Sequence, residues 1–587
     1  MADYDRLLRV AAGEEPADLV IRAINLLNVI TRDVYPVTIG LCQDTIAYVT
    51  SPEDPHCEGL HVLDGRGLWA APGLIDSHMH IESTHLTPEY FAAAVVPRGV
   101  TTVAQDPHEM ANVLGMAGVE YMRDASRGLP LRVLTFVSTC VPAVPGLETS
   151  GAEFGAKDVD DLLTQGGPDT IGLAEVMDYW GVIRRTPRIS AIVQVGRVRG
   201  TILTGHIRIQ GQRELNTYLA AGIDSDHEIL TPEGILERSH LGMTIEICCA
   251  RHRDNIAAAV ESWRQRGHIE NLVFVTDDVP PHELVKEGHL DRAVRRAIQL
   301  GMAPVDAVRA ATLIPARRLR RPELGQIAPG RTADILIISD LQNFVVNQVI
   351  VAGKIVAENG RMLSEPEAGV HPPTQAYQSV RLPEFQADDF RVACDVLSKS
   401  GKGNSVRAHV LTQRGRGNLQ SISLPVIAGR VEWQADADLA MVSVWHRHGL
   451  NNNHSSVLIA GTGLRSGAIA TTYAHDSHNL VVIGRNPQDM AAAANALRES
   501  GGGYVVVSDG QVRALAALPV AGLLAERPLE ELATEFSAFI QAAIELGVVD
   551  NPLGLITSLP LPVVPRYRPT DMGLVDVENQ KLVPAFE

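Results

Sequence analysis

A pair of histidines follows a short apolar run near the start of the chain. The run is PGLID at 72–76, which has the pattern of a strand, and His78 and His80 come directly after it. Side chains two residues apart on a strand point the same way, so both imidazoles can bind one metal ion. The spacing alone is not specific, because 20 histidines in 587 residues give about one such pair by chance. His446 and His448 repeat it, and we expect them to lie in a solvated polar loop.

Four more side chains that can bind a metal follow later strand-like runs. They are Glu175, His206, His227 and Asp277. In a barrel of parallel strands, the carboxyl ends of the strands meet at one rim, where the catalytic groups lie. Together with His78 and His80, these residues would supply enough ligands for two divalent cations that share a bridge.

The elements that must position these residues are eight short apolar runs that alternate with helical patterns. The runs cover residues 72–76, 99–105, 132–139, 170–176, 201–205, 222–225, 243–248 and 272–276. Alternation of this kind is typical of βα units and a parallel sheet. Eight strands over about 240 residues is the number and size expected of a (β/α)8 barrel. We therefore predict such a barrel at 71–315.

The segments on either side of the predicted barrel have other patterns. Short β-rich runs at 18–70 and again at 324–356 predict a small β-sandwich built from 1–70 and 316–360, with the barrel inserted between its two parts. Residues 361–379 are polar and rich in proline, which indicates a linker. A mixed pattern follows and predicts a C-terminal α+β domain at 380–587. There, Gly501–Gly503 end a helix at 486–500 rather than forming a phosphate loop.

Composition excludes several classes of function. With 51 basic and 69 acidic residues the net charge is −18, which argues against a nucleic-acid partner. The hydrophobic fraction of 45% and charged fraction of 20% are typical of a globular protein with a large core. We find no pattern of a signal peptide or a membrane span, and the six cysteines are too sparse for a disulfide framework. These features favour a reduced cytoplasmic protein without a membrane partner.

Six motifs together carry a specific resemblance. They are PGLIDSHMHIES, DPHE, GLAEVM, SDHE, TDD followed by EGHLD, and AHDSHN. In this combination the chain resembles the adenine deaminases of the amidohydrolase superfamily over nearly its whole length. The resemblance implies hydrolysis of adenine, a small purine base, to hypoxanthine and ammonia. It also implies two divalent metal ions per chain, manganese or iron with zinc as a third option, and a homo-oligomer, most simply a dimer.

The family pattern also assigns roles to residues. His78, His80 and Asp277 would bind one metal, His206 and His227 the other, and Glu175 would bridge them. The catalytic set is then Asp277, Glu175 and His227. We expect a hydroxide between the metals to attack C6 of the purine, with Asp277 moving its proton to the departing amine.

Six further residues are candidates for substrate binding. They are Asp106, His108, Glu109, Asp278, His475 and His478. For the first three, a turn that starts a helix at Asp106-Pro107 is an equally good interpretation. For the last two, the alternatives are a lid over the site and a polar turn between strands. Asp278 simply follows Asp277.

Two positions depart from the family pattern. The usual Arg-Glu-Gly-Ser run is replaced by residues 247–253, which include Cys248 and Cys249, and an arginine that often follows the Asp pair is replaced by Val279. These changes keep alternatives open: a deaminase for an N6-substituted adenine or another heterocycle, or an amide hydrolase of the same superfamily. A non-catalytic relative is disfavoured by the intact ligand set.

Overall fold

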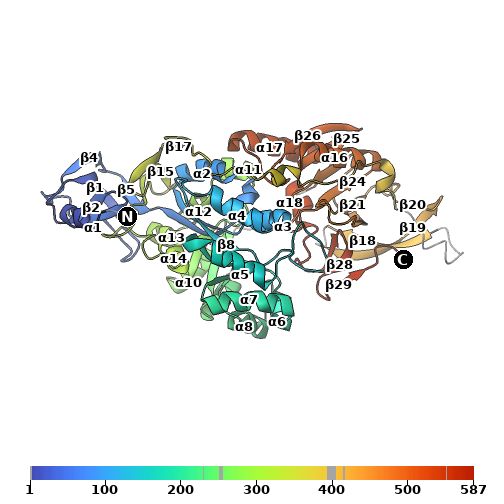
Figure 1. Cartoon of the computed structure of the whole chain (residues 1–587), viewed down its shortest axis with the longest axis horizontal. Helices are drawn as coiled ribbons and strands as arrows, with labels where there is room; N and C mark the ends of the chain where they lie inside the picture. Colours follow the sequence, from blue (N-terminus) through green and yellow to red (C-terminus); the bar gives the residue numbers. More distant parts are fainter. Residues whose placement is uncertain are drawn as a thin grey trace.

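The molecule is elongated, with a β-rich part at one end, a barrel in the middle and a second β-rich part at the other end (Figure 1). It is known from a computed structural model that describes residues 3–209, 211–228, 231–249, 255–392, 405–413, 417–549 and 551–587. The predicted fold class, an α/β barrel flanked by a small β unit and a C-terminal α+β unit, is confirmed. The domain boundaries given above remain predictions.

The central barrel consists of eight parallel strands, one for each predicted run. They are β6 (Leu74–Met79), β7 (Val100–Gln105), β8 (Arg132–Val137), β9 (Thr170–Val176), β10 (Ile202–Gly205), β11 (Ser225–Asp226), β12 (Thr244–Cys248) and β13 (Leu272–Val275). Strands β6 to β10 form one sheet and β11 to β13 another. The backbone nitrogen of Asp277 donates to the carbonyl of His78 at 3.1 Å, and that of Asp224 donates to Leu203 at 3.4 Å, so both seams are closed.

Helices connect the barrel strands and cover the outside of the barrel. They are α2 (Pro88–Val95), α3 (His108–Leu114), α4 (Met116–Ala125), α5 (Ala156–Gln165), α6 (Tyr179–Arg184), α7 (Pro187–Arg199), α8 (Gln212–Ala220), α9 (Pro232–His240), α10 (Asn255–Arg266), α11 (Pro281–Glu287), α12 (Leu290–Gln299), α13 (Pro304–Ala310) and α14 (Leu313–Arg318). Several begin with proline, whose fixed φ suits the first helical turn. Helix α7 ends at Gly200, whose φ of 64° allows the left-handed cap.

Two distant segments build one sheet at the N-terminal end. Its strands are β1 (Ala17–Asn28), β2 (Asp33–Cys42), β3 (Thr45–Thr50), β4 (Gly59–Asp64), β5 (Trp69–Pro72), β14 (Ile335–Asp340), β15 (Val345–Val351), β16 (Lys354–Glu358) and β17 (Arg361–Met362). Strand β14 pairs with β5, which joins the two segments. Ile21 and Ile39 from the first segment share a buried cluster with Ile335 and Ile350 from the second. Helix α1 (Tyr4–Ala11) lies against β2 and β3.

The C-terminal part contains a second nine-stranded sheet. Its strands are β18 (Ser405–Thr412), β19 (Asn418–Ile427), β20 (Arg430–Val431), β21 (Leu439–Trp445), β22 (His454–Ala460), β23 (Ala468–Thr471), β24 (Leu480–Gly484), β25 (Gly503–Ser508) and β26 (Gln511–Ala517). Helices α16 (Pro487–Ser500), α17 (Leu529–Glu545) and α18 (Pro552–Ser558) and a small sheet of β27 (Tyr567–Thr570), β28 (Gly573–Asp576) and β29 (Lys581–Val583) complete it. Gly501 caps α16 with a φ of 76°, as predicted.

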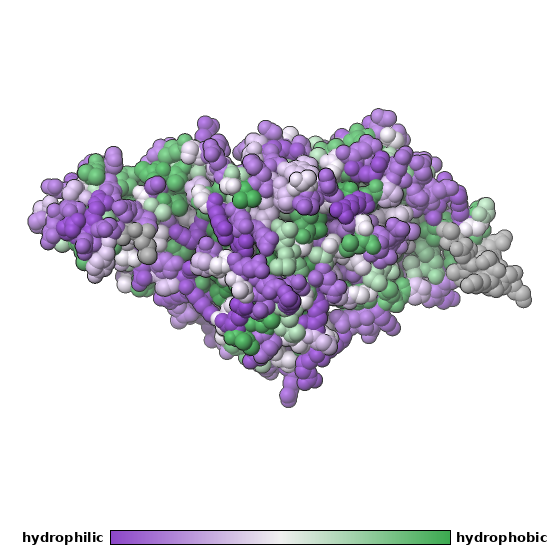
Figure 2. All heavy atoms as spheres, viewed as in Figure 1, coloured by the Kyte–Doolittle hydropathy of each residue, from purple (hydrophilic) through white to green (hydrophobic). Residues whose placement is uncertain are grey.

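The outer surface mixes hydrophilic and hydrophobic side chains. On the face in Figure 2 the hydrophobic residues lie in separate patches among hydrophilic ones. Within the described residues, each helix is too short or too polar to cross a lipid bilayer.

His85 joins the barrel to the C-terminal part. It follows the short 3-10 helix η1 (Ile81–Thr84), is 2% exposed, and its Nδ1 donates to the carbonyl oxygen of Leu523 at 2.9 Å. Its ring stacks on Phe536 with the centroids 4.8 Å apart. Burial disfavours the charged imidazole and lowers the pKa of His85 to about 3. The domain contact therefore requires a neutral histidine.

This burial predicts a pH-dependent loss of stability. The unfolded chain takes up a proton at His85 below pH 6.5, while the folded chain takes it up only near pH 3. The contribution of neutral His85 to the free energy of unfolding is therefore complete above pH 6.5. It is lost as the pH falls toward 3, by at most about 1.4 kcal/mol per pH unit. We expect the urea midpoint of His85→Asn to fall less steeply than that of the wild type between pH 7 and 5. Other histidines affect both proteins alike, so parallel pH profiles would contradict this role.

Candidate active site

One group of donor atoms lies where the first and last barrel strands meet. His78 is the penultimate residue of β6 and His80 is the first residue after it. Asp277 follows β13 and has a φ of 59°. Oδ1 of Asp277 lies 3.7 Å from Nε2 of His78 and 3.3 Å from Nε2 of His80. Nδ1 of His80 lies 3.0 Å from the carbonyl oxygen of Asp106, which directs Nε2 toward the group.

A second group lies across the rim at the ends of β10 and β11. Nδ1 of His206 and Nε2 of His227 are 3.0 Å apart. Both face Oε2 of Glu175, at 2.8 Å and 3.3 Å respectively. Three donor atoms from three strand ends thus meet at one point.

Glu175, near the end of β9, connects the two groups. While its Oε2 faces His206 and His227, its Oε1 lies 3.5 Å from Nε2 of His80. Each carboxylate oxygen therefore faces a different group. A carboxylate placed in this way could contribute one oxygen to each of two cations.

These residues fit divalent metal ions. Ligands bound at 2.0 to 2.2 Å to a common ion lie roughly 3 to 3.5 Å from one another, and the separations within the two groups are 2.8 to 3.7 Å. Nε2 of His78 is buried and has no hydrogen-bond partner among the described residues. Although burial opposes their charge, contacts with histidines keep the pKa values of Glu175 and Asp277 well below the usual range. Buried anions of this kind require a cationic partner.

Two acidic residues at the site were not predicted. Oε1 of Glu228 lies 3.3 Å from Nε2 of His206, and its Oε2 pairs with Nε of Arg208 at 2.8 Å. Glu246 on β12 is fully buried, with Oε2 3.8 Å from Nδ1 of His227. The signal for Glu228 was its place beside His227. The signal for Glu246 was a charged residue within an apolar strand.

The C-terminal part reaches this rim through residues 472–479, the loop between β23 and β24. Nδ1 of His475 contacts Oε1 of Glu109 at 2.9 Å, and the hydroxyl of Tyr473 donates to the same oxygen at 3.0 Å. His478 contacts the other oxygen, Oε2. The AHDSHN segment at 474–479, for which a lid and a polar turn were the alternatives, therefore packs against the barrel and is buried there.

Asp106 does not cap the helix that follows it. Helix α3 begins at His108 without a side-chain cap. Instead, Oδ2 of Asp106 bonds to Nδ1 of His108 at 2.9 Å, and its Oδ1 accepts from the hydroxyl of Ser138 at 2.9 Å. Asp106 thus fixes the ring of His108, whose Nδ1 lies 3.6 Å from Oε1 of Glu175.

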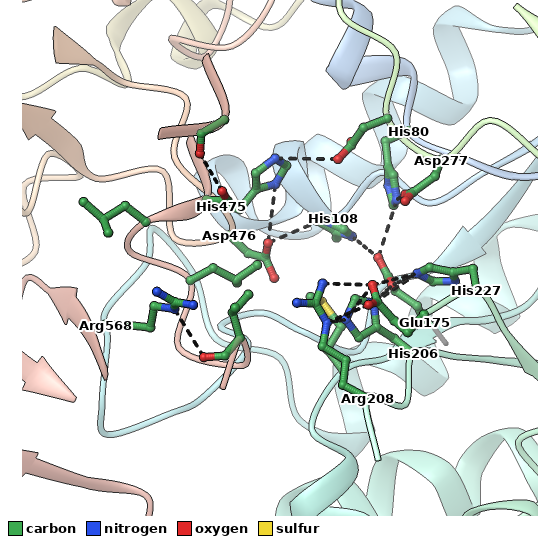
Figure 3. A pocket seen from close by; sticks show the side chains of 18 of the residues that line it. His80, His108, Glu175, His206, Arg208, His227, Asp277, His475, Asp476 and Arg568 are labelled. Carbon is green, nitrogen blue, oxygen red and sulfur yellow. Dashed lines mark hydrogen bonds and ion pairs between the residues drawn. The ribbon is translucent and has the colours of Figure 1, made fainter. Parts of the chain in front are cut away.

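A cavity of about 350 Å³ opens onto the two groups of donor atoms. Figure 3 shows His475 and Asp476 on one side of it and Glu175, His206 and His227 on the other. Of the six candidates for substrate binding, His108, Asp278 and His475 line the cavity, and Asp106 and Glu109 contact residues of its wall. His478 lies one step further out, in contact with Glu109. Leu555, Leu559 and Leu561 give it an apolar side.

Known proteins share this organisation. Residues 69–356 match the model of the amidohydrolase family, and residues 417–581 match the adenine deaminase C-terminal domain. Adenine deaminase 2 of Agrobacterium fabrum is 39% identical over 98% of this chain and 95% of its own length. The chain belongs to the adenine deaminase family. An adenine deaminase of Moorella thermoacetica is 38% identical over 98% of this chain and 97% of its own length. The family resemblance predicted from the motifs is therefore confirmed.

The prediction for the second histidine pair was wrong. His446 and His448 are 5% and 6% exposed rather than solvated. Nδ1 of His446 lies 3.1 Å from the hydroxyl of Thr149, and Nε2 of His448 donates to the carbonyl oxygen of Ser477 at 2.8 Å. Contact between the barrel and the C-terminal domain of this adenine deaminase family member removes them from water.

The positions that depart from the family pattern lie close to the site. Sγ of Cys248, at the end of β12, is 3.7 Å from Oδ2 of Asp277. Val279 is buried, and its backbone nitrogen donates to the hydroxyl of Ser83 at 3.0 Å. Residues 250–253 of the altered segment lie outside the described residues. Among the described cysteines, both Cys248 and Cys249 are free thiols.

Proposed function

We propose that this protein hydrolyses adenine to hypoxanthine and ammonia. The observation that supports the proposal is the convergence of six side chains that could hold metal ions, in a chain related to adenine deaminases over 98% of its length. The substrate is a small purine base. We place the protein in the cytoplasm, most simply as a homodimer.

The proposal includes two divalent metal ions, manganese or iron, with zinc as a third option. His78, His80 and Asp277 would hold one, His206 and His227 would hold the other, and Glu175 would contribute one carboxylate oxygen to each. Divalent ions at such a centre act as Lewis acids and make hydroxide available at neutral pH. Glu228 lies beside Nε2 of His206, the ring nitrogen opposite the one that faces Glu175, and helps to hold that ring in place.

Asp277 moves the proton in this proposal. Its Oδ1 faces His78 and His80, while Oδ2 faces away from them toward Cys248. The side chain is 26% exposed and borders the cavity, so it can reach a bound molecule. It accepts the proton of the attacking water and returns it to the departing amine.

The loop at 472–479 acts as a lid. His475 and His478 hold it to the barrel through Glu109, and Asp106 sets the orientation of His108 beside the site. Asp278 borders the same cavity. The lid excludes water from the reacting atoms and limits the size of the substrate.

The metal requirement is testable by removal and return of the ions. We expect chelation to abolish ammonia release and added manganese to restore it. Glu175→Gln, which weakens both metal groups, should lower deamination by at least ~10²-fold, as for loss of a key electrostatic group. Its metal content, measured by elemental analysis, should also fall. Full activity in chelated protein would contradict a metal-dependent site.

A further inference from the structure

The lid carries a buried carboxylate that the roles above do not explain. Asp476 borders the cavity and is 1% exposed. Its Oδ2 has no hydrogen-bond partner among the described residues. Oδ1 lies 3.8 Å from Nε2 of His108 and 3.6 Å from Nδ1 of His475, both beyond hydrogen-bond distance.

Donors close to Asp476 are directed elsewhere. Nδ1 of His475 and the hydroxyl of Tyr473 both approach Oε1 of Glu109, at 2.9 Å and 3.0 Å. Nε2 of His108 lies closer to Oε1 of Glu109, at 3.5 Å, than to Oδ1 of Asp476. A buried carboxylate oxygen without a donor is costly, so the missing donor is expected from a molecule in the cavity.

We propose that Asp476 accepts a hydrogen bond from the ring N–H of an unsubstituted purine base. The inference rests on the proposed function and names the group that recognises its substrate. A free purine carries one N–H on its five-membered ring, whereas a purine substituted at N9 carries none. The reacting C6 lies on the other ring, and Asp476 likewise lies across the cavity from Glu175 and His227 (Figure 3).

His475 supplies a matching donor beside this acceptor. Its Nε2 borders the cavity and has no hydrogen-bond partner among the described residues, although Oδ2 of Asp278 lies 3.8 Å away. Burial opposes its charge, but Glu109 and Asp278 raise the pKa of His475 to about 10, so Nε2 carries a hydrogen. In adenine the acceptor N3 is adjacent to N9–H. Acceptor and donor on the lid therefore complement one edge of the free base.

The test compares adenine with 9-methyladenine, which has the same reacting C6 but no ring N–H. We expect the wild type to prefer adenine in kcat/KM. In Asp476→Ala the value for adenine should fall by ~10²-fold, as for loss of a charged hydrogen bond. The value for 9-methyladenine should change little. The ratio of kcat/KM for adenine to kcat/KM for 9-methyladenine would then fall by a similar factor.

Matched controls separate recognition from damage to the fold. Asp571 is also 1% exposed and lies in the same domain, but it bonds to Thr149 and does not border the cavity. Asp571→Ala should keep the wild-type ratio. If Asp476→Ala does not fold, Asp476→Asn keeps the shape and should show a smaller decrease in the ratio. An unchanged ratio in the folded variant, or equal losses for both substrates, would overturn the inference.

Product binding distinguishes this inference from the proposed function. Calorimetry with hypoxanthine and 9-methylhypoxanthine measures recognition without turnover. We expect Asp476→Ala to weaken only hypoxanthine binding. If the wild type releases no ammonia from adenine, the proposed function fails. If the wild type deaminates adenine but the variant binds both products as the wild type does, the role of Asp476 fails.

Discussion

Asp277→Asn is expected to lower kcat for adenine by ~10² to 10⁴-fold, the range for loss of an acid–base group. The amide keeps the size of the side chain and an oxygen that can bind a metal, but it cannot carry a proton. The present geometry places Oδ1 3.3 Å from Nε2 of His80 and leaves Oδ2 facing away from that group. Metal binding and proton transfer would therefore use different oxygens of one side chain.

Metal content distinguishes these two functions of Asp277. We expect Asp277→Asn to keep most of its metal while losing turnover, which elemental analysis and initial rates measure on the same sample. A variant that loses metal and activity in proportion would indicate a ligand only. Near-normal turnover would remove Asp277 from the mechanism.

The kcat/KM for adenine is expected to exceed that for adenosine by ~10⁴-fold or more, because the nucleoside would leave polar groups of the site without a partner. In the proposed closed site, the loop at 472–479 serves as a lid that Glu109 holds to the barrel, with Nδ1 of His475 2.9 Å from that carboxylate. A ribose on N9 would have to displace the lid. It would also remove the N–H that Asp476 accepts.

Values of kcat/KM for adenine and adenosine measure this discrimination. Glu109→Gln weakens the contact with His475 and should reduce the discrimination, because the lid then opens more easily. A preference for adenosine would refute a closed site. Equal discrimination in Glu109→Gln would show that the lid contact does not set it.

Local pattern predicted much of the barrel and brought together the side chains of the candidate site. His78, His80, Glu175, His206 and Asp277 each follow or end an apolar strand, and the rule that strand ends share a rim brings them together without any knowledge of the fold. The short run at 222–225 meets a strand only at its last residue, because β11 comprises Ser225 and Asp226 alone. Strand alternation and chain order contain this information.

Tertiary contacts decided the features that local pattern missed. His446 and His448 lie in a polar sequence, yet Thr149 and Ser477 bury them from distant parts of the chain. Glu246 lies between apolar residues of β12, so the sequence pattern predicted a strand there and did not single it out as a site residue. The contact of the lid with Glu109 joins positions more than 360 residues apart, as its bond from Tyr473 shows. Such pairings depend on how domains pack, which no single segment specifies.

The central claim is that this site removes ammonia from adenine itself. The most direct measurement compares kcat/KM for adenine and N6-methyladenine with manganese-loaded protein, by assaying hypoxanthine together with ammonia or methylamine. The account predicts one ammonia per hypoxanthine and a clear preference for adenine. A preference for N6-methyladenine, with release of methylamine, would contradict it. The altered segment beside Cys248 would then be assigned the role of accommodating a larger substituent on N6 of the substrate.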